Sequence, residues 1–157
     1  MSIRLVRRGL GLLALLTIFG FGLPVAAADE AIGYVKTASG FVQVVRGGRA
    51  YPIEAGAAVY RQDELITGRT GKIGVTFRDG SRVSLGATSH LSLKSFEFEP
   101  AEEKLGFFAR LVHGSVHIIT GVISKLAPDA FSVETPVATI AVRGTNFAAR
   151  APGGPTR

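Results

Sequence analysis

The segment Ile73-Gly74-Val75-Thr76-Phe77-Arg78-Asp79-Gly80-Ser81-Arg82-Val83-Ser84-Leu85 decides the fold class. Apolar residues alternate with polar or small ones on both sides of its Asp-Gly pair, which is the period of a strand with one buried face. Asp-Gly between two such runs favours a two-residue type I′ turn. The segment therefore predicts a β-hairpin in which Ile73, Val75 and Phe77 share the buried face.

The same period recurs upstream and downstream of this hairpin. Residues 40–46 predict a strand, Gly47-Gly48 a turn into residues 50–53, and residues 54–56 a second turn. Leu91 and Leu93 lie in one phase of the alternation, whereas Phe96 and Phe98 lie in the other. A β-bulge near Lys94-Ser95 would keep all four in the core, because a bulge shifts the alternation by one residue.

The remaining segments continue the β pattern. We predict a crossover loop over residues 104–111, a strand over 112–119, and a loop with a helical turn over 121–129. Strands are predicted over residues 131–134 and 137–147, the last one broken by Gly144. The whole pattern predicts an all-β fold, an antiparallel sandwich or jelly-roll-like single domain.

Residues 1–28 have the layout of a secretory signal peptide. A basic start precedes an apolar run over residues 9–23, Pro24 breaks it, and Ala26-Ala27-Ala28 supplies small residues for cleavage. We predict a signal peptide helix that is cleaved after Ala28, with Ala26 and Ala28 at the cleavage site. The alternative is an uncleaved anchor, because no charge follows the basic start before Asp29.

Composition limits the function classes. The chain has 157 residues, 46% of them hydrophobic, no Cys, and a formal net charge of +6. Three of its 18 basic residues and none of its 12 acidic ones lie in residues 1–28, so the remainder carries only +3. A chain without Cys has no disulfide and no thiol nucleophile. We predict a periplasmic or secreted protein that binds no nucleic acid.

Several short motifs resemble the FecR domain, which occurs in bacterial cell-surface signalling regulators and in many exported proteins. The motif residues are Gly40, Val42, Val44 and Arg46; Ile53 and Gly56; Asp63, Leu65, Thr67 and Gly68; Phe77, Asp79, Gly80 and Ser81; and Thr135, Pro136, Ala138, Thr139, Ile140, Val142, Arg143, Gly144, Thr145 and Phe147. Their order and spacing extend over about 110 residues, from Gly40 to Phe147. The resemblance implies an all-β domain outside the cytoplasm, here expected over residues 29–150.

Both ends depart from the plan of the iron-uptake regulators in that family. An export signal stands where they carry an anti-sigma region, so control of a sigma factor is not carried over. Relatives usually continue with further strands after the Arg-Gly-Thr motif, whereas residues 151–157 predict a flexible tail, with truncation as an alternative. A missing strand would expose a sheet edge.

Three histidines are the candidate metal ligands. His113 and His117 face the same way on a strand, about 13 Å apart at 3.3 Å per residue, which is too far for one ion. His90 is assigned no role, and no metal or cofactor is expected. Cross-strand or surface histidines are the preferred interpretation.

No catalytic residue is predicted. The chain lacks a Gly-x-Ser-x-Gly elbow and a phosphate-binding glycine frame. Asp63, Glu64 and Asp79 lie in contexts where carboxylates cap backbone amides. An envelope enzyme acting on polysaccharide, with paired carboxylates, remains the second alternative function.

The family-motif residues Asp79, Gly80, Ser81, Thr135, Pro136, Arg143, Gly144 and Thr145 are interpreted first as structural. Arg143 lies in an apolar strand and needs carboxylate or carbonyl partners, so an internal clamp is preferred over a recognition role. The leading functional hypothesis is an exported, non-catalytic binding or scaffold module of the bacterial cell envelope, which engages a protein or a surface polymer. The alternative is a membrane-anchored component of transmembrane signalling, in which an uncleaved leader contacts the membrane. Oligomeric state has no signature in the sequence.

Overall fold

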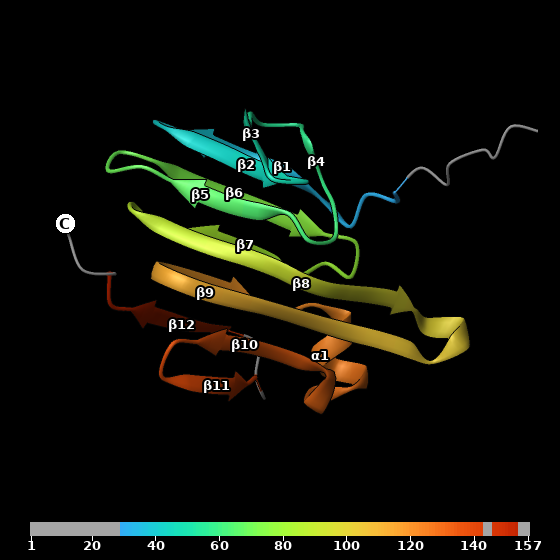
Figure 1. Cartoon of the computed structure of the whole chain (residues 1–157). Helices are drawn as coiled ribbons and strands as arrows, with labels where there is room; N and C mark the ends of the chain where they lie inside the picture. Colours follow the sequence, from blue (N-terminus) through green and yellow to red (C-terminus); the bar gives the residue numbers. More distant parts are fainter. Residues whose placement is uncertain (1–28, 143–145, 154–157) are drawn as a thin grey trace, which may run out of the picture.

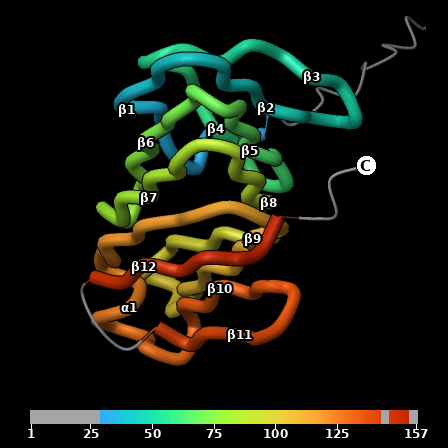
Figure 2. The backbone as a smooth tube through the Cα atoms, turned by 90° about the vertical axis from the view of Figure 1, so that its left-hand side faces the viewer, coloured from blue at the N-terminus to red at the C-terminus, as the bar shows by residue number. Residues whose placement is uncertain are grey.

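The computed structural model describes residues 29–142 and 146–153. Twelve strands form one hydrogen-bonded sheet, which curls so that its two halves face each other across the core (Figures 1 and 2). The elements are β1 (Gly33–Ser39), β2 (Val42–Arg46), β3 (Arg49–Pro52), β4 (Ala58–Val59), β5 (Glu64–Thr67), β6 (Lys72–Phe77), β7 (Arg82–Leu85), β8 (Ser89–Glu99), β9 (Lys104–Ile119), β10 (Phe131–Thr135), β11 (Ala138–Ala141) and β12 (Asn146–Ala151), with the helix α1 (Val122–Leu126) and 3-10 turns η1 (Pro100–Glu102) and η2 (Pro128–Ala130).

The sheet follows the order β3-β2-β5-β8-β9-β7-β6-β1-β4. We call the outer side of β2, β5, β8, residues 104–113 of β9, and β10 the front face, which is nearer the viewer in Figure 1. The outer side of β1, β6, β7, residues 114–119 of β9, and β12 is the back face. All pairs are antiparallel except that of β9 with β10, which is parallel.

The long strand β9 joins the two halves. Up to His113 it pairs with β8, and from Gly114 onward it pairs with β7 and β12. Gly114 has φ +92°, and a Cβ there would lie 2.4 Å from Ser89 Cα. Only glycine fits this bend. Any other residue would be strained by the positive φ, and its Cβ would clash with Ser89.

Phenylalanines from four strands fill the centre. Phe107 of β9 stacks on Phe131 of β10, with ring centroids 4.3 Å apart, and meets Phe77 of β6 edge to face at 5.1 Å. Phe96 of β8 lies 5.7 Å from Phe77. Such contacts add to the area that each ring buries. The front and back halves therefore share one aromatic core.

The all-β prediction is confirmed, but the two separate sheets of a sandwich are not what forms. Because β9 bends at Gly114, both halves belong to one sheet. The bulge predicted near Lys94-Ser95 is confirmed by the shift of register between Leu93 and Ser95. It keeps Leu91, Leu93 and Phe96 buried, with Phe98 packed at the margin.

Two local predictions are wrong. Residues 104–111 are the first half of β9 and no crossover loop, because the tight turn at η1 folds the chain straight back onto β8. The hairpin of β6 and β7 forms with Ile73, Val75 and Phe77 buried, but its turn is not type I′. Only Gly80, at φ +82°, has a left-handed backbone, whereas type I′ requires Asp79 to have one too.

The predicted signal peptide falls outside the described residues. Among the helices of residues 29–142 and 146–153, none has the length and apolar character needed to cross a bilayer.

Candidate functional site

The Asp79-Gly80-Ser81 motif forms a buried polar junction. Asp79 accepts hydrogen bonds from the backbone N–H of Ser81 at 3.0 Å and from its hydroxyl at 2.6 Å. Ser81 Oγ accepts the N–H of Gly121 at 2.8 Å, and the Asp79 carbonyl accepts that of Val122 at 2.8 Å. Asp79 and Ser81 are 1% and 0% exposed. The motif thus fastens the β6–β7 turn to the start of α1.

Gly121 completes this junction by having no side chain. A Cβ there would lie 2.2 Å from the Asp79 carbonyl oxygen and 2.5 Å from the Ser81 nitrogen. Both carboxylate oxygens of Asp79 and the hydroxyl of Ser81 already bond within the chain, which is the arrangement of a structural junction.

The other motif residues lie apart from this junction. The Thr135 hydroxyl bonds to both the N–H and the carbonyl of Ala138, closing the β10–β11 turn, while Pro136 is exposed. Arg143, Gly144 and Thr145 lie outside the described residues, and so do Ala26 and Ala28. The proposed Arg143 clamp stays a prediction.

An arginine clamp does form elsewhere, at Arg46. Its guanidinium binds both oxygens of Asp63 at 2.7 Å and lies over the ring of Tyr60, 4.2 Å from the centroid. Asp63, which is 0% exposed, also accepts the N–H of Tyr60 at 2.8 Å. The hydrogen bonds to Asp63 raise the pKa of Arg46 above its ordinary value. The capping role predicted for Asp63 and Asp79 is confirmed, but the clamp was missed.

A second buried junction holds the bend of β9. The Thr67 hydroxyl donates to the Gly86 carbonyl at 2.6 Å and accepts the N–H of Ser89 at 2.9 Å. Ser89 Oγ in turn accepts the N–H of Ser115 at 2.9 Å. Thr67 and Ser89 are almost fully buried, so β5, β8 and β9 are fixed together at this end.

The front face brings histidines together that the sequence left separate. His90 lies 3.0 Å from Glu64 and meets the ring of His113 edge to face at 5.7 Å. His90, to which the sequence assigned no role, therefore belongs to a cluster with Glu64 and His113. The capping role predicted for Glu64 is wrong, because Glu64 lies within β5. Glu64, His90 and His113 are far apart in the chain, so they form no local motif. They come together only because β8 pairs with both β5 and β9.

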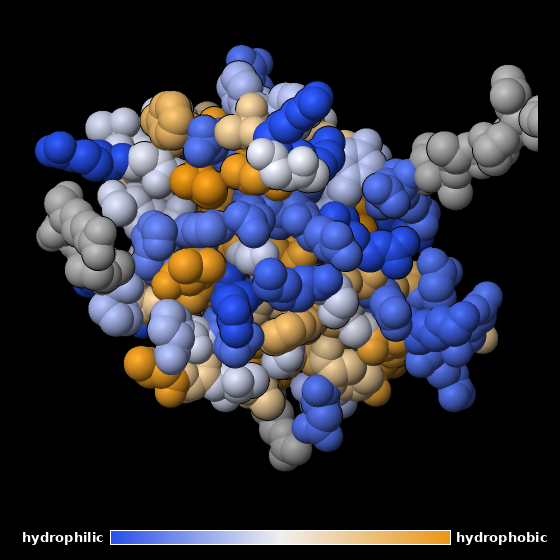
Figure 3. Space-filling view, viewed as in Figure 1, coloured by the Kyte–Doolittle hydropathy of each residue, from blue (hydrophilic) through white to orange (hydrophobic). Residues whose placement is uncertain are grey.

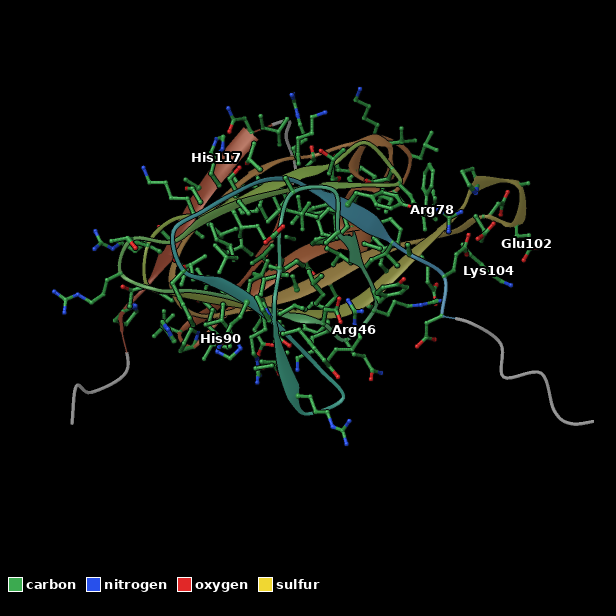
Figure 4. All side chains as sticks on the ribbon, turned by 90° about the horizontal axis from the view of Figure 1, so that it is seen from above. Arg46, Arg78, His90, Glu102, Lys104 and His117 are labelled. Carbon is green, nitrogen blue, oxygen red and sulfur yellow. The ribbon has the colours of Figure 1, made fainter. Side chains whose placement is uncertain are left out.

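His117 lies on the opposite face from His90 (Figure 4) and contacts Asn146 Oδ1 at 2.6 Å. His113 and His117 thus do not converge on one ion. Among the described residues, no group of three or more His, Cys, Asp or Glu is placed to hold a metal.

Arg110 and Glu134 form a further ion pair on the front face. Two hydrogen bonds of 2.9 Å join them across β9 and β10. The bonds from Arg110 lower the pKa of Glu134 below its ordinary value. Figure 3, viewed from this side, shows hydrophilic residues interspersed with apolar patches.

Carboxylates share a hollow of about 270 Å³ beside the β8–β9 hairpin. Its lining includes Glu30, Glu97 and Glu99 together with Arg61, Arg78 and Lys104. Glu30 forms an ion pair with Arg78 at 2.7 Å. Arg78 and Lys104 lie at the same end of the molecule in Figure 4. Cations equal acids in number here, an arrangement typical of ion pairing at a surface.

Comparison with known protein families matches residues 63–157 to the family described as FecR protein. This chain belongs to the FecR family. The FecR match begins at Asp63, the acid of the Arg46 clamp, and includes the Asp79-Gly80-Ser81 junction. β1 to β4 precede the matched residues, yet they belong to the same sheet, because β1 pairs with β6 and β2 pairs with β5.

The curated proteins contain no match to this chain, and neither do the solved structures. FecR domains are linked to signalling and regulatory proteins of the bacterial envelope and are typically non-catalytic.

Proposed function

We propose that this protein is an exported, non-catalytic FecR module that binds a protein or a polymer of the bacterial cell envelope. The family match over residues 63–157 is the observation that carries the proposal. The signal-peptide layout of residues 1–28 supports a periplasmic or secreted location.

The polar contacts favour a binding module over an enzyme. Asp79, Ser81, Thr67 and Ser89 bond within the chain and fasten strands together. A sheet held in this way presents two broad outer faces, which suit recognition of a partner surface.

Export and cleavage are tested first. The full chain is produced in a bacterial host, and the N-terminus and intact mass of the protein outside the cytoplasm are determined. A start at Asp29 supports the proposal, whereas retention in the cytoplasm contradicts it. Leu15→Arg is the matched control, because a charge within the apolar run should abolish export.

A membrane-anchored signalling component is the second candidate. The absence of charge between the basic start and Asp29 favours it, because such a leader remains in the bilayer when it is not cleaved. Recovery of a chain that starts at Met1 from the membrane fraction would support this candidate. Ala26→Leu, which blocks cleavage, provides the reference mass for the retained leader.

A further inference from the structure

The back face carries charge of one sign only. Its strands contain no Asp or Glu within the described residues, but they contain Lys36 on β1, Lys72 on β6, Arg82 on β7 and Arg150 on β12. All four side chains are exposed, and none forms an ion pair with another described residue. Nitrogen-tipped side chains project beside His117 on this side in Figure 4.

A hollow of about 130 Å³ lies between two of these cations. Its lining includes Lys36 and Arg82, the hydroxyl residues Thr37, Thr76 and Ser84, and Gly74. A Cβ on Gly74 would lie 2.7 Å from Thr37 Oγ1 and 3.8 Å from Ser84 Oγ, so the missing side chain leaves room between two hydroxyls. Hydroxyl donors flanked by an ammonium and a guanidinium match the chemistry of a carboxylate, sulfate or phosphate group.

Tyr34 adjoins this hollow and adds an aromatic surface. It is 56% exposed and pairs in register with Thr76, which pairs with Arg82. A tyrosine ring offers a flat apolar body with a polar tip, which suits a partner that is itself part apolar and part polar.

We propose that the back face binds an acidic polysaccharide, with one anionic group of the polymer seated in the hollow over Gly74 between Lys36 and Arg82. This inference rests on the proposed function, because it names the partner class of the exported module. Repeated anionic groups along the polymer match the unpaired cations spread over several strands.

An anionic membrane fits this face less well. Attachment to a bilayer surface combines charge with apolar side chains inserted between the lipids. Of the exposed large hydrophobic residues in the described chain, only Tyr34 belongs to the strands of the back face. Hydroxyls and a hollow suit a hydroxyl-rich chain better than a lipid surface.

The test measures binding of the purified protein to alginate, a polyuronate, and to neutral dextran of matched length. We expect binding to alginate that weakens with salt, and none to dextran. Lys36→Gln with Arg82→Gln should weaken alginate binding about tenfold or more, because two charge-assisted contacts are lost. Arg49→Gln with Lys94→Gln is the matched control, since it removes two exposed cations from β3 and β8, and it should change binding less than twofold.

A second variant separates the hollow from general attraction. Gly74→Val keeps every charge but fills the space beside Thr37, so it should weaken binding comparably, with thermal unfolding recorded to establish that each variant is folded. Equal weakening by the two cation pairs, or unchanged binding by Gly74→Val, would overturn the proposal. Binding to anionic phospholipid vesicles or to single-stranded DNA but not to alginate would overturn it too.

The two proposals fail in distinguishable ways. Capture of an envelope component that persists undiminished in the Lys36→Gln, Arg82→Gln variant leaves the binding module standing and overturns the polysaccharide site. A protein that is not exported contradicts the proposed function, while its binding to alginate is measured independently.

Discussion

The two faces of the sheet enclose one core but differ in how their charged residues are paired. On the front face, Glu134 binds Arg110 and Glu64 contacts His90, so each of these two acids has a basic partner within the chain. On the back face, Lys36, Lys72, Arg82 and Arg150 have no acidic neighbour on their strands. A face that neutralises itself gains little from a charged partner, whereas a face of unpaired cations attracts an anionic one.

The largest effect is expected where the two faces are joined. Phe107→Ala removes the ring that contacts both Phe77 and Phe131, and we expect a loss of about 3 to 5 kcal/mol in the free energy of unfolding. Urea denaturation measures it. Phe98→Ala, at a partly buried position, is the control; a loss no larger than that of the control would disprove the shared core.

The bend of β9 should be the next most sensitive position. Gly114→Ala forces a side chain into a left-handed backbone and against Ser89, so we expect a loss of about 2 to 4 kcal/mol. Gly48→Ala is matched, because Gly48 also has positive φ but has no atom within 4 Å of an added Cβ. Equal losses in thermal unfolding would show that the contact with Ser89 contributes nothing.

On the front half, the Arg46 clamp tests what a buried acid requires. Arg46→Gln leaves the carboxylate of Asp63 buried without its cation, and we expect a loss of about 1 to 3 kcal/mol, reduced by solvent because the Arg46 side chain is 42% exposed. Arg49→Gln removes a nearby exposed cation and should change stability by less than about 0.5 kcal/mol. Chemical denaturation of both variants decides; indistinguishable curves would refute the clamp.

The smallest effect concerns the Arg110–Glu134 pair. Arg110 lowers the pKa of Glu134 in the folded state. The stabilisation that this pair contributes is therefore present above the ordinary pKa of Glu, and it is lost as pH falls through the lowered pKa of Glu134. Arg110→Gln should return the pKa of Glu134 toward the ordinary range. Carboxyl NMR titration measures this, and an unchanged pKa in the variant would contradict the pairing.

The sequence predicted the strands wherever alternation was local. The β6–β7 hairpin and the bulge near Lys94-Ser95 follow from the phase of the apolar residues alone. The course of β9 did not, because its first half needs β8 and β10 as neighbours, and its polar start at Lys104 resembles a loop. The turn type depends on the backbone of single residues, because Gly80 has a positive φ and Asp79 does not.

The functional features depended on residues far apart in the chain. Arg46 meets Asp63 and His90 meets His113 only after the strands pair, so neither contact has a local motif. The sequences of the back-face strands already show that they contain no acids. Which strands share that face follows only from their order in the sheet. Composition gives only a net charge of +3 for residues 29–157, which does not show on which face the cations lie.

The order of strands in the sheet also governs how the chain can fold as it is made. β1 pairs with β4 and β6, whose paired residues follow it by 24 to 44 positions, whereas the residues of β3 follow their partners in β2 by only 3 to 9 positions. Synthesis proceeds from the N-terminus, so most of β1, which pairs with β4 only at Gly33 and Tyr34, has no partner until Lys72–Phe77 has emerged. Distant pairing of this kind slows folding. The back half is complete only when β12, the last strand of the described residues, pairs with β9, so this half closes after residue 151 has been made.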